Sequence, residues 1–185
     1  MQIITDDKYM ASRSVVALGM FDGVHIGHQA LIRRAQALAR ALDAACIVCT
    51  FDRHPRSVLF PASAPVPLMT QEEQLSEFEK LGVDWALIKH FDMDFADMAA
   101  DVFVASLVSA TKARGIVCGN NYSFGKGGAG GPDMLRELSG AFNYRLEVLS
   151  PVKDSGEMVS STLIRALIKN GDLARADRLM GRTRD

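Results

Sequence analysis

Residues 19–28, GMFDGVHIGH, gather glycines, an aspartate and two histidines where an apolar run meets a helix-like pattern. The N-terminus of a helix offers unpaired N–H groups and partial positive charge, which suit a phosphate, and glycines let that phosphate approach the backbone. His25 and His28 are three positions apart, so on a first helical turn they share a face and can both donate to it. Because the Gly-Lys-Ser/Thr ending of a Walker A loop is missing, the stretch predicts another kind of phosphate-binding turn. The alternative is a tight glycine-rich turn with incidental histidines.

A second candidate phosphate site is VSSTLIR, residues 159–165. Ser160 or Ser161 can cap a helix, and the same hydroxyl and N–H groups can hold a phosphate. Arg165 would lie on the first turn or just beyond it, where its guanidinium can fork onto phosphate oxygens. The alternative is a common helix cap followed by a surface arginine.

A glycine-rich stretch, GNNYSFGKGGAGG at residues 119–131, carries groups that suit a planar, phosphorylated ligand. Asn121 offers an amide, Tyr122 and Phe124 offer rings, and Lys126 offers a charge. A long functional loop after a strand is one interpretation. A plain mobile loop is the other, since glycine is conformationally permissive.

The loop TFDRHPRSVLF, residues 50–60, combines anion-binding groups with apolar ones. His54 and Arg56 can reach an anion. The groups that can pack against a ring system are Phe51, Pro55 and Phe60. The alternative is a proline-rich surface turn with a salt-bridging arginine. His90 has no companion residues nearby in the sequence and is interpreted as structural.

The elements that must position these groups alternate between strand and helix patterns. Strands are expected at 14–20, 44–51, 84–91, 115–119 and 144–152, and helices at 28–44, 70–82, 94–113, 131–142, 160–171 and 172–181. Such alternation predicts an α/β fold with parallel strands and covering helices. Ligands of such sheets bind beyond the carboxyl ends of the strands, and each motif follows an expected strand.

Composition limits the class of protein. The chain has 185 residues, 48% hydrophobic and 23% charged, which predicts one globular domain over residues 1–185. A net charge of −1 disfavours a nucleic-acid partner. The sequence shows neither a membrane span nor a signal peptide, so we expect no membrane partner and a cytoplasmic location. Cys46 and Cys49 form a C-x-x-C, but in a strand they would point to opposite faces, which favours core residues over a metal or redox site.

Together the motifs resemble the adenylyltransferase (FAD synthetase) domain of the prokaryotic bifunctional riboflavin kinase/FMN adenylyltransferase family. The resemblance covers about residues 14–182 and rests on GMFDGVHIGH, TFDRHP, GNNYSFGKG, VSSTLIR and GDLARADRLMGR, in that order. It implies a Rossmann-like nucleotidylyltransferase fold, with helices on both faces of a parallel sheet. It also implies the reaction of ATP with FMN to give FAD and pyrophosphate, with Mg²⁺.

The resemblance also implies roles for particular residues. Catalytic roles fall on His25, His28 and Arg165. Binding of the ATP phosphates falls on Gly19, Phe21, Asp22, Gly23, Gly27, Ser160, Ser161 and Thr162. Flavin binding falls on Phe51, His54, Pro55, Asn121, Tyr122 and Phe124. No protein ligand is assigned to the metal, because Mg²⁺ often keeps waters and substrate phosphates as its ligands.

The sequence departs from the family pattern at Met20, where Asn is usual, and at Arg53, where Pro is usual. Family members continue into a riboflavin kinase domain with a Pro-Thr-Ala-Asn signature, which these residues lack. The chain is therefore either a stand-alone enzyme, with a separate riboflavin kinase supplying FMN, or an excised domain. Two other functions compete: a different H-x-G-H nucleotidylyltransferase, or a non-catalytic flavin-binding module.

Overall fold

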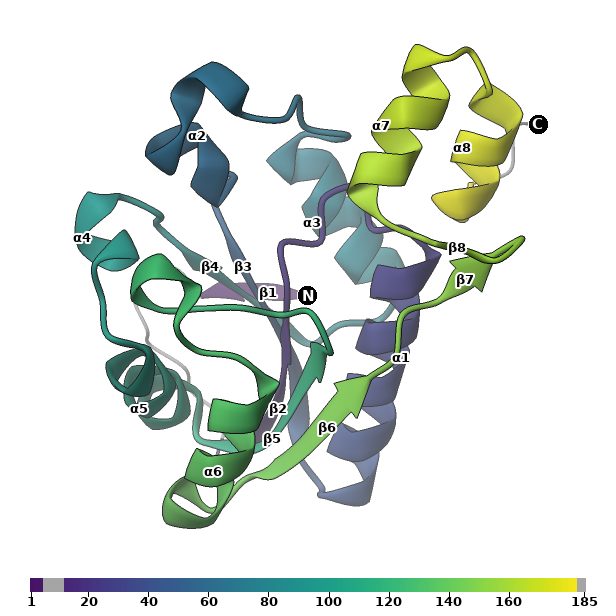
Figure 1. Ribbon diagram of the computed structural model, residues 1–185. Helices are drawn as coiled ribbons and strands as arrows, with labels where there is room; N and C mark the ends of the chain where they lie inside the picture. The colour runs from purple at the N-terminus through teal and green to yellow at the C-terminus, as the bar shows by residue number, and fades with distance from the viewer. Residues whose placement is uncertain (5–11, 183–185) are drawn as a thin grey trace.

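The structure, a computed structural model, describes residues 1–4 and 12–182. Its centre is a parallel sheet in the order β1-β4-β3-β2-β5-β6 (Figure 1). The strands are β1 (Gln2–Ile4), β2 (Ser14–Leu18), β3 (Ala45–Phe51), β4 (Trp85–Lys89), β5 (Ala113–Gly119) and β6 (Arg145–Leu149). All residues of β2 are buried, as its nearly continuous apolar run requires of a strand covered on both faces. The prediction of a parallel α/β sheet is confirmed.

Helices cover both faces of the sheet (Figure 1). The longer ones are α1 (Ile26–Ala41), α3 (Gln71–Lys80), α5 (Ala100–Thr111) and α6 (Pro132–Phe142). Buried side chains of α1 and α3 pack in one core cluster with one face of the strands. Those of α5 and α6 pack in a second cluster on the other face. Cys46 belongs to the first cluster and Cys49 to the second, so the predicted divergence of the two thiols is confirmed.

A third, smaller cluster lies beside the start of α1. It joins α7 (Ser161–Lys169) and α8 (Leu173–Leu179), and Ile26 of α1 packs against it. A hairpin of β7 (Lys153–Asp154) and β8 (Glu157–Met158) leads into α7. Figure 1 shows α7 and α8 beyond the end of the sheet where α1 begins. This placement brings the start of α7 toward the start of α1.

Several local details differ from the expected elements. The helix expected at 94–113 is split into α4 (Met93–Ala96) and α5, because Ala99 is extended and caps the second helix. The short pieces β1, α2 (Pro55–Leu59), the hairpin and the 3₁₀ turns 61–63 and 126–128 carry little periodic signal. Thr70 and Glu73 form a capping box at the start of α3. Within residues 1–4 and 12–182, no helix is long and apolar enough to cross a membrane.

Candidate functional site

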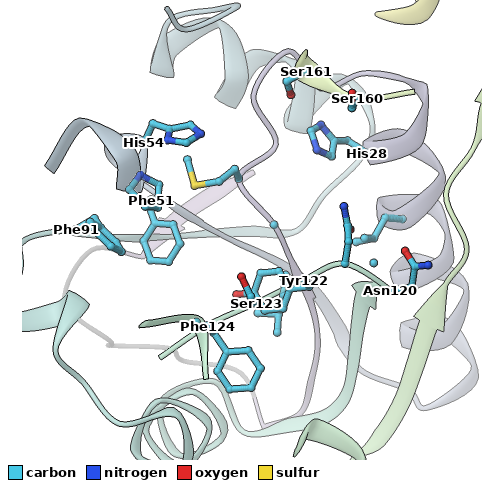
Figure 2. A pocket seen from close by; sticks show the side chains of 18 of the residues that line it. His28, Phe51, His54, Phe91, Asn120, Tyr122, Ser123, Phe124, Ser160 and Ser161 are labelled. Carbon is cyan, nitrogen blue, oxygen red and sulfur yellow. The ribbon is translucent and has the colours of Figure 1, made fainter. Parts of the chain in front are cut away.

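A cavity of about 970 Å³ lies at the carboxyl ends of the central strands. It collects side chains from the start of α1, the end of β3, the glycine-rich loop after β5 and the start of α7 (Figure 2). The predicted site residues that line it are Gly19, His25, Gly27, His28, Phe51, His54, Pro55, Asn121, Tyr122, Phe124, Ser160, Ser161, Thr162 and Arg165. Sequence-distant motifs therefore meet in one space.

His25 is the N-cap of α1, and its Nδ1 accepts a hydrogen bond from the His28 backbone N–H at 3.3 Å. Burial lowers the pKa of His25 to about 4, so the ring is neutral near pH 7. A neutral imidazole that accepts at Nδ1 carries its proton at Nε2. His25 thus presents an N–H donor without a positive charge of its own.

His28 lies against His25, with the two rings stacked at 3.6 Å between centroids and 14° between planes. Burial, together with the neighbouring His25, lowers the pKa of His28 well below its usual value. Its Nδ1 is buried and, among the described residues, has no hydrogen-bond partner. The Phe21 ring lies 5.2 Å from the His28 ring and is itself fully buried. Phe21 therefore supports His28 from the core and does not line the cavity.

The start of α7 supplies the second polar element. Ser160 is the N-cap, and its Oγ accepts the Leu163 backbone N–H at 3.2 Å. The Ser161 Oγ donates to the Asp22 carbonyl oxygen at 2.9 Å. Figure 2 shows Ser160 and Ser161 on the same side of the cavity as His28. The N-termini of α1 and α7 thus border one polar end of the cavity.

Arg165 lines this end, but its guanidinium already has protein partners. Its Nε donates to the Val66 carbonyl oxygen at 2.6 Å, and its Nη2 pairs with the Asp22 carboxylate. Asp22 is buried, and Gly23 beside it has φ of +81°, where a Cβ would lie 2.8 Å from Leu68 Cδ1. Neither Asp22 nor Gly23 lines the large cavity. Asp22 instead lines a smaller cavity that adjoins the large one, and the predicted contact of both residues with ATP phosphate stays a prediction.

The side chains near the polar end determine which ligands the protein could offer to Mg²⁺. Within the described part of the chain, no group of three or more His, Cys, Asp or Glu side chains could hold a metal ion. Both oxygens of the nearby Asp22 carboxylate are engaged, with Arg165 and with the Leu68 backbone N–H. A Mg²⁺ ion here would take its ligands from substrate phosphates and water, as that ion commonly does.

The opposite end of the cavity is aromatic (Figure 2). Ring centroids 5.2 to 6.0 Å apart connect Phe51, Phe91, Phe95, Phe103, Phe124 and Tyr122 into one continuous cluster. Three of these rings, on Phe91, Phe95 and Phe103, are additions to the predicted set. Two of them lie just after β4, at the same sheet edge as the predicted motifs, which is the one signal that could have found them.

The glycine-rich loop is anchored and not plain mobile chain. Phe124 and Gly130 exchange two backbone hydrogen bonds, of 3.1 and 2.9 Å. A Cβ on Gly130 would lie 2.5 Å from the Phe124 ring, so only glycine fits under it. Asn121 remains exposed beside the cavity. Lys126 also lines the cavity and pairs with Asp97 at 3.0 Å.

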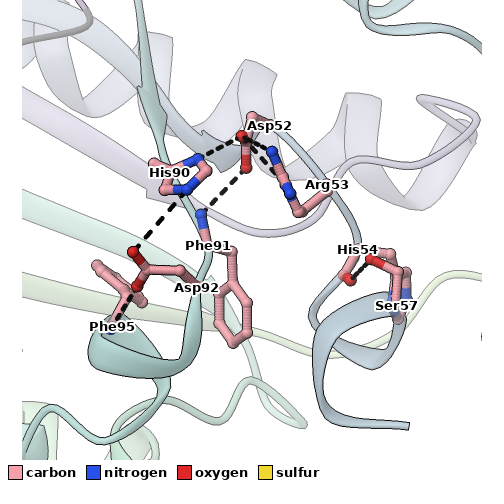
Figure 3. Close-up of polar contacts among 8 residues, drawn as sticks. All are labelled: Asp52, Arg53, His54, Ser57, His90, Phe91, Asp92 and Phe95. Carbon is pink, nitrogen blue, oxygen red and sulfur yellow. Dashed lines mark hydrogen bonds and ion pairs between the residues drawn. The ribbon is translucent and has the colours of Figure 1, made fainter. Parts of the chain in front are cut away.

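Asp52 joins the ends of β3 and β4 beside the cavity (Figure 3). It accepts from the Phe91 backbone N–H at 3.0 Å, contacts His90 Nδ1 at 2.7 Å and pairs with Arg53 at 3.1 Å. Burial alone would raise the pKa of Asp52, but these partners bring it below its usual value. His90 therefore has a close partner in Asp52, and its structural role stays a prediction. Arg53 lines a separate cavity of about 470 Å³.

His54 and Met20 lie where the two cavities adjoin. His54 is the N-cap of α2, and its Nδ1 accepts the Arg56 backbone N–H at 3.1 Å. Burial and the nearby charge of Arg165 lower the pKa of His54. The Met20 carbonyl accepts from Thr50 and Gln74 at 3.0 and 2.9 Å. Met20 thus borders both cavities and is held in place through its carbonyl oxygen.

Known proteins of one enzyme family are similar to this chain. A family model described as FAD synthetase matches residues 7–163. The chain is 34% identical to a bifunctional riboflavin kinase/FMN adenylyltransferase of Listeria monocytogenes, over 96% of this chain and 57% of the relative. It is 32% identical to that of Haemophilus influenzae, over 90% and 54%. A putative one of Geobacillus thermodenitrificans is 35% identical, over 91% and 89%. The chain thus spans about half the length of the first two.

Two solved structures share the fold. A Streptococcus pneumoniae protein titled a macrolide-efflux protein has a TM-score of 0.88 and 31% identity, covering 98% of this chain and 71% of that one. A pantoate-beta-alanine ligase from Francisella tularensis has a TM-score of 0.58 and 16% identity, covering 98% and 78%. The second likeness shows the fold alone. Both agree with a Rossmann-like α/β sheet.

Proposed function

This chain belongs to the FAD synthetase family, and from that premise we propose that it transfers the adenylyl group of ATP to FMN. The products are FAD and pyrophosphate. One observation carries the proposal: a single cavity has a polar end at two helix N-termini and an aromatic end built from six rings. A polar end for phosphates and an apolar slot for a ring system are what a flavin nucleotide and ATP need together.

The polar end suits the ATP phosphates. Unpaired N–H groups at the starts of α1 and α7 provide partial positive charge without a side-chain cation. His25 and His28 add neutral N–H donors, and Arg165 adds a full positive charge. Charge that grows on phosphate oxygens during the reaction would be stabilised by these donors, which are already in place.

The aromatic end suits the isoalloxazine ring of FMN. Phe51, Phe91 and Tyr122 supply apolar faces, and large aromatic surfaces bind planar rings well. Asn121 adds an exposed amide that can donate to and accept from polar edges of the ligand. The volume of about 970 Å³ lies at the upper end of ordinary ligand cavities, as two nucleotides would need.

In the proposed reaction an oxygen of the FMN phosphate attacks the α-phosphorus of ATP. A new phosphorus–oxygen bond forms, the bond from the α-phosphorus to the bridging oxygen breaks, and pyrophosphate leaves with that electron pair. No protein nucleophile is needed, so the residues act by aligning the phosphates and stabilising their charge. When bound with ATP, Mg²⁺ would neutralise part of the phosphate charge. The cytoplasmic location and the separate riboflavin kinase stay predictions.

The proposal is tested by incubating the purified chain with ATP, MgCl₂ and FMN and separating the products by chromatography. We expect FAD, and no adenylylated product when phosphopantetheine, nicotinamide mononucleotide or glycerol phosphate replaces FMN. Adenylylation of another acceptor without FAD would assign the chain to a different nucleotidylyltransferase. Tight FMN binding without turnover would make it a flavin-binding module.

A further inference from the structure

Asp22 lies where three segments of the polar end meet, and we propose that it is a positioning residue for Arg165. In this role it acts through Arg165 and Ser161 and does not itself contact phosphate or metal. The inference rests on the proposed function for its kinetic consequence only. The structural basis of the inference is the set of contacts that the carboxylate and the backbone carbonyl of Asp22 make.

Both oxygens of the Asp22 carboxylate have protein partners. One oxygen accepts the Leu68 backbone N–H at 2.8 Å, and the other pairs with Arg165 Nη2. The side chains of Asp22 and Arg165 are only 11% and 21% exposed, so the pair is partly shielded from water. An ion pair in such a setting holds its geometry better than an exposed one. A carboxylate directed at Arg165 would also repel a phosphate, which argues against direct binding.

The contacts of Arg165 fix the plane of its guanidinium. Nε is held by the Val66 carbonyl and Nη2 by Asp22. A guanidinium carries five N–H donors, so those on Nη1 and the second on Nη2 remain for a ligand. Arg165 borders the large cavity, where such a ligand would lie. Asp22 thereby sets the direction from which Arg165 can meet a phosphate.

The backbone of Asp22 also joins the two helix starts. Its carbonyl accepts from Ser161 in the first turn of α7, and three residues later the chain reaches the N-cap of α1. The turn is strained, because Phe21 and Val24 have φ of 53° and 39°, a region that side chains rarely adopt. Such a turn persists only when its surroundings hold it, and the contacts of Asp22 are part of that hold.

A double-mutant cycle separates positioning from a general structural role. Asp22→Asn keeps an oxygen for the Leu68 N–H and keeps the carbonyl for Ser161, but it removes the charge that holds Arg165. We expect kcat to fall by about 10²-fold, the cost of a misplacement of about 1 Å. In an Arg165→Gln background the same substitution should have no further effect on kcat, because Asp22 then has no guanidinium to position. Additive losses, or a wild-type kcat for Asp22→Asn, would overturn the proposal.

The matched control is Asp154→Asn, which breaks the Arg175–Asp154 ion pair of 2.9 Å in the β7–β8 hairpin. Its side chains are similarly covered, at 21% and 20% exposure. This variant should keep wild-type kcat. Asp22→Glu keeps the charge and should retain more activity than Asp22→Asn. If Asp22→Asn does not fold, Asp22→Glu is combined with Arg165→Gln in the same cycle. Losses in kcat that do not add support the positioning role, and additive losses contradict it.

A binding readout keeps the two proposals apart. Calorimetric titration with α,β-methylene ATP measures how tightly the polar end binds the nucleotide. No turnover interferes, because this analogue cannot lose pyrophosphate. Asp22→Asn should weaken this binding in the wild-type background and leave it unchanged in the Arg165→Gln background. If the chain makes no FAD, the proposed function fails while this binding cycle still decides the role of Asp22. Equal weakening in both backgrounds would contradict the positioning role.

Discussion

His28 is the residue whose environment fits a catalytic role most closely. It lines the cavity, it stacks on His25, and burial keeps it neutral. His28→Ala should still fold, because it loses ring contacts with His25 and Phe21 but no side-chain hydrogen bond to the described protein. Removing one preorganised donor lowers kcat by about 10²–10³-fold. We predict a loss of that size in steady-state kinetics, with a smaller change in KM for ATP.

The control for His28 is His90→Gln, since His90 is exposed and lines neither cavity. It should keep a wild-type kcat. A folded His28→Ala protein that turns over at the wild-type rate would remove His28 from the mechanism. A melting temperature far below that of the wild type would instead assign the histidine to the fold.

Asn121 gives a second test at the level of one side chain. It is exposed on an anchored loop, so its amide does not hold the core. We predict that Asn121→Ala melts at the wild-type temperature but uses substrate less well, by about tenfold or more in kcat/KM for FMN, as loss of a substrate hydrogen bond implies. Steady-state kinetics with FMN and ATP varied in turn check this. Unchanged constants for both substrates would reject the role.

Sequence spacing predicts the candidate residues that belong to one short motif. His25, Gly27 and His28 follow from a helix start, and Ser160 follows from a cap. The sequence does not show that Asp22 faces Arg165, because that contact joins positions 143 apart. The three additional rings also depend on tertiary structure, since they come from the loop after β4, from α4 and from α5. They come near Phe51 because β3 pairs with β4.

The first turn of α1 links helix geometry to catalysis through Gly27. A Cβ at this position would lie 3.2 Å from both Nδ1 and Cε1 of His25. Alanine is favoured over glycine inside a helix by up to about 1 kcal/mol, which offsets the cost of disturbing the His25 N-cap, so Gly27→Ala should change the melting temperature little. It should displace the His25 ring and lower kcat, by about tenfold or more. Thermal unfolding and steady-state kinetics on one preparation check both parts.

The matched control for Gly27 is Gly140→Ala in α6, where a Cβ meets no atom within 4 Å. It should gain stability of up to about 1 kcal/mol with no change in kcat. Equal kinetic behaviour of the two alanine variants would show that the His25 ring tolerates the displacement.

At the level of elements, the long periodic segments are predictable and their interruptions are not. The helices α1, α3 and α6 carry apolar spacing, a capping box or a proline at the first turn. The break between α4 and α5 occurs inside an apolar pattern, where Lys126 N–H bonds to the Met98 carbonyl at 2.8 Å. A backbone contact with a loop distant in sequence leaves no local signal. The break shapes the aromatic end of the cavity.

The whole molecule should lose stability in mild acid because of its buried imidazoles. The pKa of His25 is about 4 in the folded chain, against a usual value of 6.5. The unfolded chain therefore binds more protons between these values, and the free energy of unfolding falls as the pH falls through that range. From pH 7 to pH 5 this group alone removes about 2 kcal/mol. The stability contribution is fully present above about pH 6.5.

Urea unfolding at pH 7 and pH 5 measures this effect. His25→Asn retains a good N-cap residue and loses the titrating ring, so its stability should fall less between the two pH values. The comparison with wild type cancels the carboxylates, which titrate in both proteins. An identical pH dependence for the two proteins would show that His25 is not the group responsible.

The most direct test of the whole account follows the phosphorus atoms of ATP. The chain is incubated with FMN and MgCl₂ and with ATP labelled at either the α- or the γ-phosphate, and the products are separated. Adenylyl transfer to FMN places the α-label in FAD and the γ-label in pyrophosphate, at equal rates, and both rates should fall together in His28→Ala. Transfer of the γ-label to a flavin, or retention of both labels in ATP while FMN is bound, would contradict the account.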